Sequence, residues 1–178
     1  MNYENLISFL IKQAGKLPKN LKKYFPENSD EVPRLYWISR FEVNEELRTN
    51  KLSPLRYNEL NYDIPKIHKA LELATTIYAD IIKKPTVMYR GVSGSFAKKI
   101  KPGFTFVDQG FVYLTEKKDI AKLYSKRKGF VLKVIVPSGQ KGKIGLKDQG
   151  EFILPRFTKF EVIEVNDNEA TLKIIKGD

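Results

Sequence analysis

The sequence contains no cysteine and a single histidine, His68. Without cysteine the chain has no disulfide, no thiolate nucleophile and no cysteine-based metal site. One histidine is too few for a histidine-rich zinc site or for catalysis by a pair of histidines, so no metal is expected. Because His68 follows Ile67 on an expected helix, we interpret it as a residue at the core boundary or the surface, not as a catalyst.

Several common active-site motifs are also missing. The chain contains no G-x-x-x-x-G-K-[ST] loop, no G-x-G-x-x-G fingerprint after a strand, no H-E-x-x-H helix and no G-x-S-x-G elbow. The usual sequence support for nucleotide hydrolysis, dinucleotide redox chemistry and serine hydrolysis is therefore absent.

Long apolar runs are lacking as well. No stretch approaches about 18 uninterrupted apolar residues, so no membrane span is expected. Residues 1–17 lack a basic start, a long apolar run and a small-residue cleavage site, so they are not expected to form a conventional secretory signal.

The chain does contain enough apolar material for one packed domain. It has 178 residues, of which 42% are hydrophobic, including 11 Phe and 9 Tyr. Lys and Arg number 32 against 21 Asp and Glu, which gives a net charge of +11. This excess indicates an anionic partner, such as nucleic acid, a phosphate-bearing ligand or an acidic protein surface. The alternative is that the lysines, which are spread along the whole chain, serve only solubility.

Helical spacing of apolar residues dominates the chain before Pro85. The clearest stripe runs from Ile64 to Ile82 with a period of about 3.6, directly after the capping residue Asp63. The expected helices are an N-terminal helix that precedes a basic connector over residues 16–28, a second helix from residue 29 or 30 towards Arg48, and a third from residue 63 to residue 84.

Short runs rich in β-branched and aromatic residues dominate the chain after Pro85, separated by Gly, Pro, Asn and Asp. Helices followed by many short strands indicate an α+β fold with a mainly antiparallel sheet. Residues 1–28 are expected to form a helix and linker, and residues 29–178 one domain. The expected strands cover residues 86–92, 104–107, 110–114, 130–136, 152–154, 159–165 and 170–175, with a helix over 117–126 and a hairpin turn at 166–168.

Two polar residues stand at the ends of expected strands. Arg90, in the run Tyr89-Arg90-Gly91, can offer its planar guanidinium to a phosphate, or it can form a surface salt bridge. Thr115 follows the strand at 110–114, where it can face a ligand or cap the next helix.

A third polar segment opens the strand at 152–154. Gln149 and Glu151 are two residues apart, so in an extended chain they point to the same side and into the same cleft. The alternative interpretation of Glu151 is a charge at the edge of a strand.

In this order the segments resemble the arginine-serine-glutamate class of mono-ADP-ribosyltransferases, which includes bacterial toxins and phage enzymes. The matching text is YRGV at 89–92, GFVYLT at 110–115 and QGEFILPR at 149–156. Upstream, Asn44-Glu45-Glu46-Leu47-Arg48 resembles the helical I-N-x-x-L-R segment of that family. The similarity spans roughly residues 31–165.

The resemblance implies N-terminal helices packed on a mainly antiparallel, split β-sheet core. It also implies an NAD-dependent enzyme that transfers ADP-ribose from NAD to a macromolecule and releases nicotinamide, with NAD as substrate and without a metal. Glu151 is then expected to stabilise the positive charge that develops on the ribose, Gln149 to meet the acceptor, and Arg90 to hold the phosphates. The residues that the resemblance assigns to NAD binding are Arg90, Gly91, Tyr113, Thr115, Asn44 and Arg48.

The acceptor stays open among several classes. In this family a Gln in the place of Gln149 is typical of enzymes that do not modify arginine, so another protein side chain is favoured over nucleic acid. The alternatives are ADP-ribosylation of nucleic acid and a catalytically silent, basic nucleic-acid-binding module. The resemblance further implies a secreted or injected toxin or effector, or a phage protein, acting in a host cytoplasm.

One departure from the family pattern matters, the Tyr in place of a first Ser, whereas Thr115 retains a hydroxyl at the third position. The S-T-S tripeptide of the family is Tyr113-Leu114-Thr115 in this chain. Tyr113 either stacks on nicotinamide or crowds the pocket. Residues 141–148 are expected to form a short, basic loop without aromatic residues that presents the acceptor.

Overall fold

The computed structural model describes residues 44–49, 64–77, 79–92, 94–125, 130–145 and 149–175. No helix in this part of the chain is long and apolar enough to cross a membrane. The helices are α4 (Asn44–Thr49), α6 (Ile64–Thr76), α7 (Gly94–Ala97) and α8 (Lys118–Ser125). The strands are β1 (Asp80–Ile81), β2 (Thr86–Val92), β3 (Thr105–Val107), β4 (Val112–Thr115), β5 (Phe130–Val136), β6 (Lys141–Ile144), β7 (Glu151–Leu154), β8 (Lys159–Asn166) and β9 (Glu169–Ile175).

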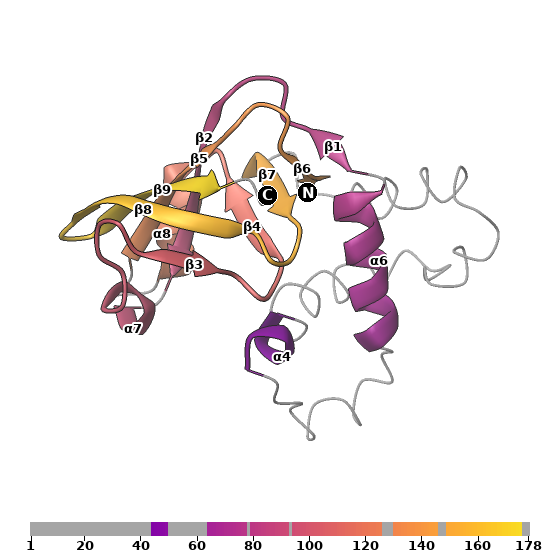
Figure 1. Cartoon of the computed structure of the whole chain (residues 1–178), viewed down its shortest axis with the longest axis horizontal. Helices are drawn as coiled ribbons and strands as arrows, with labels where there is room; N and C mark the ends of the chain where they lie inside the picture. Colours follow the sequence, from indigo (N-terminus) through magenta and orange to yellow (C-terminus); the bar gives the residue numbers. More distant parts are fainter. Residues whose placement is uncertain are drawn as a thin grey trace.

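The strands form one sheet in the order β1-β6-β7-β4-β2-β5-β9-β8-β3 (Figure 1). Every neighbouring pair is antiparallel except β5 and β9, which are parallel. Strand β2 pairs with β5 along its whole length but with β4 through one residue pair, Tyr89 opposite Thr115. The two halves of the sheet are therefore joined at a single point, between β4 and β2.

The core lies on the face of β2 that carries Met88, and it combines side chains from both halves of the sheet. Val112 and Leu114 of β4 belong to the same buried cluster as Phe160 of β8 and Leu172 of β9. Strands β4 and β7 are buried at every position, so their sequences are nearly continuous apolar runs. Polar residues that occur within these two strands are therefore candidates for a function.

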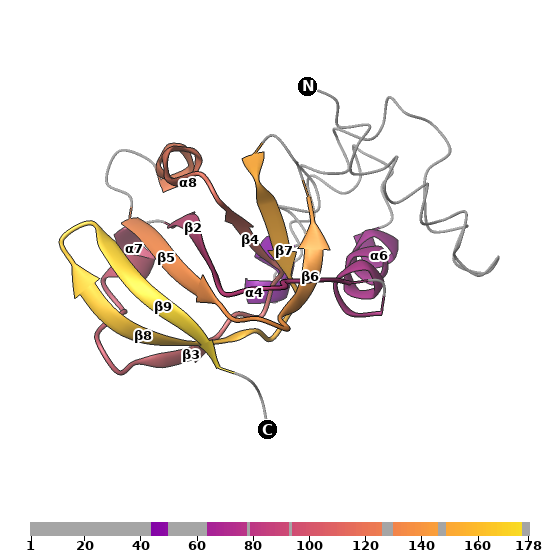
Figure 2. The same cartoon turned by 90° about the horizontal axis from the view of Figure 1, so that it is seen from above.

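Helix α8 covers the other face of β2, and α6 packs beside β6 (Figure 2). Gly91 makes the close approach of α8 possible, because a Cβ atom there would overlap the backbone oxygen of Ala121 and crowd the backbone nitrogen of Ser125. The absence of a side chain at position 91 thus has a packing reason that is independent of any ligand.

The expected mainly antiparallel sheet of an α+β domain is present, and each of the seven expected strands is confirmed within two residues at either end. The expected helix at 117–126 is α8, and the hairpin turn joins β8 to β9. The first expected helix, the connector at 16–28 and most of the second helix lie outside the described residues. The division at residue 28 therefore stays a prediction.

The third expected helix is too long. Helix α6 ends at Thr76, and Ile81, which was placed in the helical stripe, belongs to β1 and is 56% exposed. The hydroxyls of Thr75 and Thr76 donate to the carbonyls of Leu71 and Glu72, a pattern that competes with helix continuation. β-Branched residues here have low helix propensity, which explains the early end.

The expected acceptor-presenting loop at 141–148 is also wrong in its first half. Lys141–Ile144 forms β6, which pairs with β1 and β7. Lys143 is 2% exposed, and its ammonium lies 2.9 Å from the carboxylate of Asp80. A buried lysine is rare, so the sequence K-G-K-I resembled a solvated loop.

Candidate active site

A row of polar residues crosses the sheet at the point where its two halves meet. Glu151 of β7 lies opposite Thr115 of β4, Thr115 lies opposite Tyr89 of β2, and Tyr89 lies opposite Lys133 of β5. Residues that face each other across paired strands project to the same side of a sheet. Glu151 and Thr115 are 3% and 6% exposed, so this row places a carboxylate and a hydroxyl together in a buried setting.

The hydroxyl of Thr115 joins three parts of the chain. It donates a hydrogen bond to the backbone carbonyl of Gln149 and accepts one from the backbone nitrogen of Lys117, at 3.0 Å. The second bond satisfies a backbone donor just before α8 begins. Lys117, whose carbonyl accepts from the Ala121 nitrogen at 3.2 Å, occupies the N-cap position, so Thr115 precedes the cap and is not itself the cap.

The first of these bonds, from Thr115 to Gln149, fixes the backbone two residues before Glu151. Residues 149–150 form a turn in which Gly150 has a φ of 57°, so the extended chain expected from Gln149 to Glu151 is wrong and β7 begins only at Glu151.

The carboxylate of Glu151 lies against the end of β6. The backbone nitrogen of Gly145 donates to the Glu151 carbonyl at 2.9 Å. A Cβ atom at position 145 would overlap Oε2 of Glu151, so the carboxylate occupies the space that a side chain would take. Glycine at this position therefore permits the observed orientation of Glu151.

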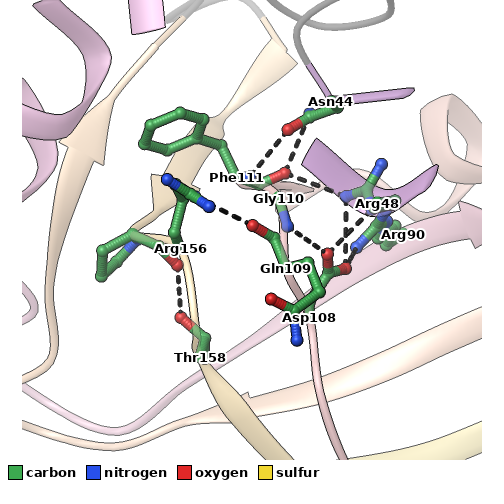
Figure 3. A network of polar contacts seen from close by, with 10 residues as sticks. Asn44, Arg48, Arg90, Asp108, Gln109, Gly110, Phe111, Arg156 and Thr158 are labelled. Carbon is green, nitrogen blue, oxygen red and sulfur yellow. Dashed lines mark hydrogen bonds and ion pairs between the residues drawn. The ribbon is translucent and has the colours of Figure 1, made fainter. Parts of the chain in front are cut away.

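Arg90 enters a cluster of charges built around Asp108 (Figure 3). Arg90 follows Tyr89, so its side chain leaves β2 on the opposite face. Nη1 of Arg90 is 2.8 Å from Oδ2 of Asp108, and Nε of Arg48 is 2.8 Å from Oδ1. Nη2 of Arg48 donates to Oδ2 at 3.2 Å, and the backbone nitrogen of Gly110 donates to Oδ1 at 2.9 Å.

Two opposing effects act on the pKa of Asp108. Burial by itself raises the pKa, but the charges of Arg90 and Arg48, and their hydrogen bonds, lower it by more. The net result is a pKa below the usual value for aspartate, because the ionised carboxylate is held by two cations. Asp108 is therefore an anion at neutral pH.

Asn44 attaches α4 to the segment that leads into β4. Its side-chain amide donates to the carbonyl of Phe111 at 3.0 Å and accepts from the Phe111 nitrogen at 2.7 Å. Nη2 of Arg48 donates to the same carbonyl at 3.2 Å. Because a Cβ atom at Gly110 would overlap Oδ1 of Asn44, glycine is required for this close contact. The short helix α4 thus places Asn44 and Arg48 beside the backbone of Phe111.

A cavity of about 140 Å³ is lined by the residues that the family resemblance assigns to NAD binding. Tyr89, Ala121 and Tyr124 complete its lining. Neither Glu151 nor Gln149 is among the described residues that line it, although Thr115 connects both to it. The predicted residues in its wall are Asn44, Arg48, Arg90, Gly91, Tyr113 and Thr115.

A second cavity of about 500 Å³ begins on the other side of the arginines. It shares Arg48, Arg90 and Gly91 with the smaller one, and its wall is otherwise mainly apolar, with Phe96 and Phe106 among its residues. Its volume lies in the range of roughly 300–1,000 Å³ that is typical of sites for organic ligands. Arg48 and Arg90 therefore line both a small cavity of mixed polarity and a larger, mainly apolar one.

Several residues of this region were not predicted. Asp108 precedes the Gly110-Phe111 pair, but no spacing in the sequence links it to the arginines. Arg156 donates to the carbonyl of Gln109 at 3.0 Å, and its Nη1 lies 2.8 Å from Nε2 of His68. His68 is half-buried and contacts the ring of Phe111 edge-on, which places it at the core boundary as expected.

A metal site is not formed in the described part of the chain, where no three His, Asp or Glu side chains group together. Asn44, Thr115 and the arginines are poor ligands for the common metal ions. The chemistry that this set favours is recognition of an anionic ligand by guanidinium groups.

No family model and no curated protein sequence matches this chain. Solved structures do resemble it. The Vis toxin, an ADP-ribosyltransferase from Vibrio splendidus, is 18% identical with a TM-score of 0.60, over 84% of this chain and 75% of that one. C3stau2 from S. aureus, solved with NAD, is 18% identical with a TM-score of 0.59, over 93% of this chain and 95% of that one.

Exoenzyme S from Pseudomonas aeruginosa shows the same likeness. It is 17% identical with a TM-score of 0.59, over 96% of this chain and 88% of that one, and its structure contains human 14-3-3 protein beta and carba-NAD. At such low identity these comparisons establish the fold. The chain thus has the mainly β-sheet fold of the bacterial ADP-ribosyltransferases.

Proposed function

We propose that this protein is an NAD-dependent mono-ADP-ribosyltransferase of the arginine-serine-glutamate class. The observation that carries the proposal is the cavity in which Asn44, Arg48, Arg90, Tyr113 and Thr115 meet. These residues come from α4, β2 and β4, and they were selected by sequence resemblance alone. The fold shared with ADP-ribosyltransferases supports the same assignment.

The guanidinium groups of Arg90 and Arg48 supply the grip on NAD. A pyrophosphate is a dianion, and arginine matches its oxygens with paired donors. Arg48 and Arg90 line both the 140 Å³ and the 500 Å³ cavities, so in this proposal a bound ligand extends from one cavity into the other. In this proposal Tyr113 offers an aromatic face to nicotinamide, and Asn44 and Thr115 shape the polar end.

Glu151 acts on the ribose. Breaking the bond to nicotinamide develops positive charge on the sugar, as in glycoside cleavage. A carboxylate already oriented by Gly145 and by the Thr115–Gln149 contact can accept a hydrogen bond from a ribose hydroxyl and stabilise that charge. A preorganised group of this kind commonly lowers the barrier by about 3–4 kcal/mol.

The acceptor is proposed to be a protein side chain other than arginine. The family resemblance assigns Gln149 to the acceptor, and an amide does not deprotonate an arginine as a carboxylate does. The protein is proposed to act as a toxin or effector in the cytoplasm of a host. Nucleic acid is the second acceptor class, and the net charge of +11 is the observation that favours it.

Incubation of the protein with labelled NAD, alone and with a cell lysate, tests the proposal. We expect free nicotinamide and label that is removed by protease and not by nuclease. Label removed by nuclease instead would identify nucleic acid as the acceptor. Salt-sensitive binding of nucleic acid without any nicotinamide would contradict the enzyme and identify a silent binding module.

Arg90→Lys tests the proposal that Arg90 binds the phosphates of NAD. Lysine keeps the charge but loses the fork of donors, so the KM for NAD is expected to rise by about 10-fold. Steady-state release of nicotinamide gives this value, and thermal unfolding shows whether the variant is folded. An unchanged KM in a folded variant would place the phosphates elsewhere.

A further inference from the structure

We infer that Asp108 is a positioning residue of the NAD site, which holds the guanidinium groups of Arg48 and Arg90 in the orientation that receives the dinucleotide. The inference rests on the proposed function, and it assigns a role to a residue outside the set selected from sequence. Its basis is the hydrogen-bonded cluster of Figure 3.

The carboxylate of Asp108 is saturated by its own chain. Oδ1 accepts from Nε of Arg48 at 2.8 Å and from the Gly110 nitrogen at 2.9 Å. Oδ2 accepts from Nη1 of Arg90 at 2.8 Å and from Nη2 of Arg48 at 3.2 Å. A carboxylate has about four lone-pair positions, and these four donors fill them. At neutral pH Asp108 therefore has no lone-pair position left with which to bind substrate.

The backbone of Asp108 is fixed by the segment that leads into β8, the strand that pairs with β3. Its nitrogen donates to the carbonyl of Thr158 at 3.1 Å, and its carbonyl accepts from the nitrogen of Phe157 at 2.8 Å. The next carbonyl, that of Gln109, accepts from Arg156 at 3.0 Å. The carboxylate is thus a fixed point, whereas the arginines arrive on two separate elements, α4 and β2.

Two long side chains are costly to hold in one orientation. An arginine side chain loses up to roughly 2 kcal/mol of conformational entropy when it is immobilised. If Asp108 orients Arg48 and Arg90 before NAD arrives, that entropy is not lost again on binding. The ligand then meets guanidinium groups that are already in place.

Removal of the negative charge of Asp108 changes NAD affinity in opposite directions for two possible roles of this residue. Asp108 lies beside the proposed site for an anion, so removing its negative charge should strengthen NAD binding if only the net charge mattered. Positioning predicts the opposite result, weaker binding, because the guanidinium groups lose their orientation. The direction of the change therefore separates the two roles.

The test compares Asp108→Asn with Glu161→Gln, which removes the same charge from an exposed ion pair with Lys173 on the β8–β9 hairpin. With nicotinamide release as the readout, Asp108→Asn is expected to raise the KM for NAD about 10-fold and to change kcat less. Glu161→Gln is expected to leave both values unchanged. A KM that is unchanged or lowered in folded Asp108→Asn would overturn the inference.

A double-mutant cycle identifies the residues through which Asp108 acts. In an Arg90→Lys background, Asp108→Asn is expected to raise the KM by clearly less than it does in the wild type, because the shared interaction is already impaired. Full additivity would show that Asp108 acts independently of Arg90 and would contradict the inference. If Asp108→Asn does not fold, Asp108→Glu takes its place, and a KM equal to that of the wild type would then contradict a role that depends on geometry.

An NMR measurement without NAD keeps this inference separate from the proposed function. The Nε–H group of Arg48 is bonded to Asp108, so its signal is expected to be resolved and slowly exchanging in the wild type and lost in Asp108→Asn. An Nε–H signal that is equally protected in both proteins would refute the positioning role of Asp108. Wild-type protein with the protected signal but no release of nicotinamide would refute the proposed function alone.

Discussion

At Gly91, strand β2 passes directly beneath the backbone of α8. A Cβ atom there would overlap the carbonyl oxygen of Ala121, which cannot move without displacing the helix. Gly91→Ala is therefore expected to lower the free energy of unfolding by about 2–3 kcal/mol, the upper part of the range for overpacked sites. Chemical denaturation measures this loss.

Gly139→Ala is the matched control for that experiment. Gly139 has a φ of 82° and open space around its Cα, so its substitution adds only backbone strain of about 1 kcal/mol. If Gly91→Ala is no more costly than Gly139→Ala, then α8 does not pack as closely as described.

Asp108 makes the stability of the fold depend on pH. Its folded-state pKa is lowered, so the ionised form is favoured in the native protein and contributes stability above the unfolded pKa of about 4. This contribution is lost as the pH falls through the lower, folded-state pKa. Asp108→Asn is therefore expected to be less stable than the wild type by about 1–3 kcal/mol at pH 7, with a difference that shrinks below about pH 4.

Urea unfolding of both proteins between neutral and acidic pH measures this difference. A gap that stays constant down to strong acid would show that the charge on Asp108 does not contribute. A gap that widens with acid would contradict the direction of the pKa shift.

At the scale of elements, local sequence patterns predicted most of the sheet. Strands β2 and β5 were located with the same boundaries, because their β-branched and aromatic runs end at Pro85, Gly129 and Pro137. Such local signals depend on side chains within a few residues of each other, which is what a single sequence displays.

Elements that depend on tertiary contacts were not predicted. Strand β6 pairs with β1 and β7, and its buried Lys143 forms an ion pair with Asp80 of β1, a residue distant in the sequence. Nothing local distinguishes K-G-K-I from a solvated loop. The early end of α6 at Thr76 has a local cause instead, because the hydroxyls of Thr75 and Thr76 bond to the helix backbone, but the hydrophobic periodicity that continues past residue 76 concealed it.

The connection between β4 and α8 is held by the hydroxyl of Thr115. Thr115→Val keeps the shape of the side chain but removes the donor to Gln149 and the acceptor for Lys117. Loss of these two hydrogen bonds is expected to lower the free energy of unfolding by about 2 kcal/mol. Release of nicotinamide is expected to fall as well, because the backbone before Glu151 loses its anchor.

Thr105→Val on β3 provides the control, because position 105 is exposed and surface substitutions usually change stability by less than about 0.5 kcal/mol. Denaturation midpoints and the kcat of nicotinamide release are measured for both variants. Equal behaviour of the two valine variants would show that the hydroxyl of Thr115 has no such role.

For the whole molecule, the candidate site is assembled where two halves of a sheet meet through one residue pair. Family motifs selected residues from α4, β2 and β4 that are up to about seventy positions apart in the chain, and these residues line one cavity. Asp108, which links them, matched no motif. Its partners Arg48 and Arg90 become neighbours only because α4 packs against Phe111. The role of Asp108 therefore follows from the tertiary structure and not from a sequence motif.

The central claim is that Glu151 acts in catalysis and that the arginines hold NAD. The most direct measurement is the rate of nicotinamide release by Glu151→Gln at saturating NAD, with NAD affinity determined by calorimetry on the same sample. The account predicts a fall in rate of at least about 100-fold, as for other preorganised groups at a developing charge, with an affinity close to that of the wild type. An unchanged rate of release in this variant would contradict the account.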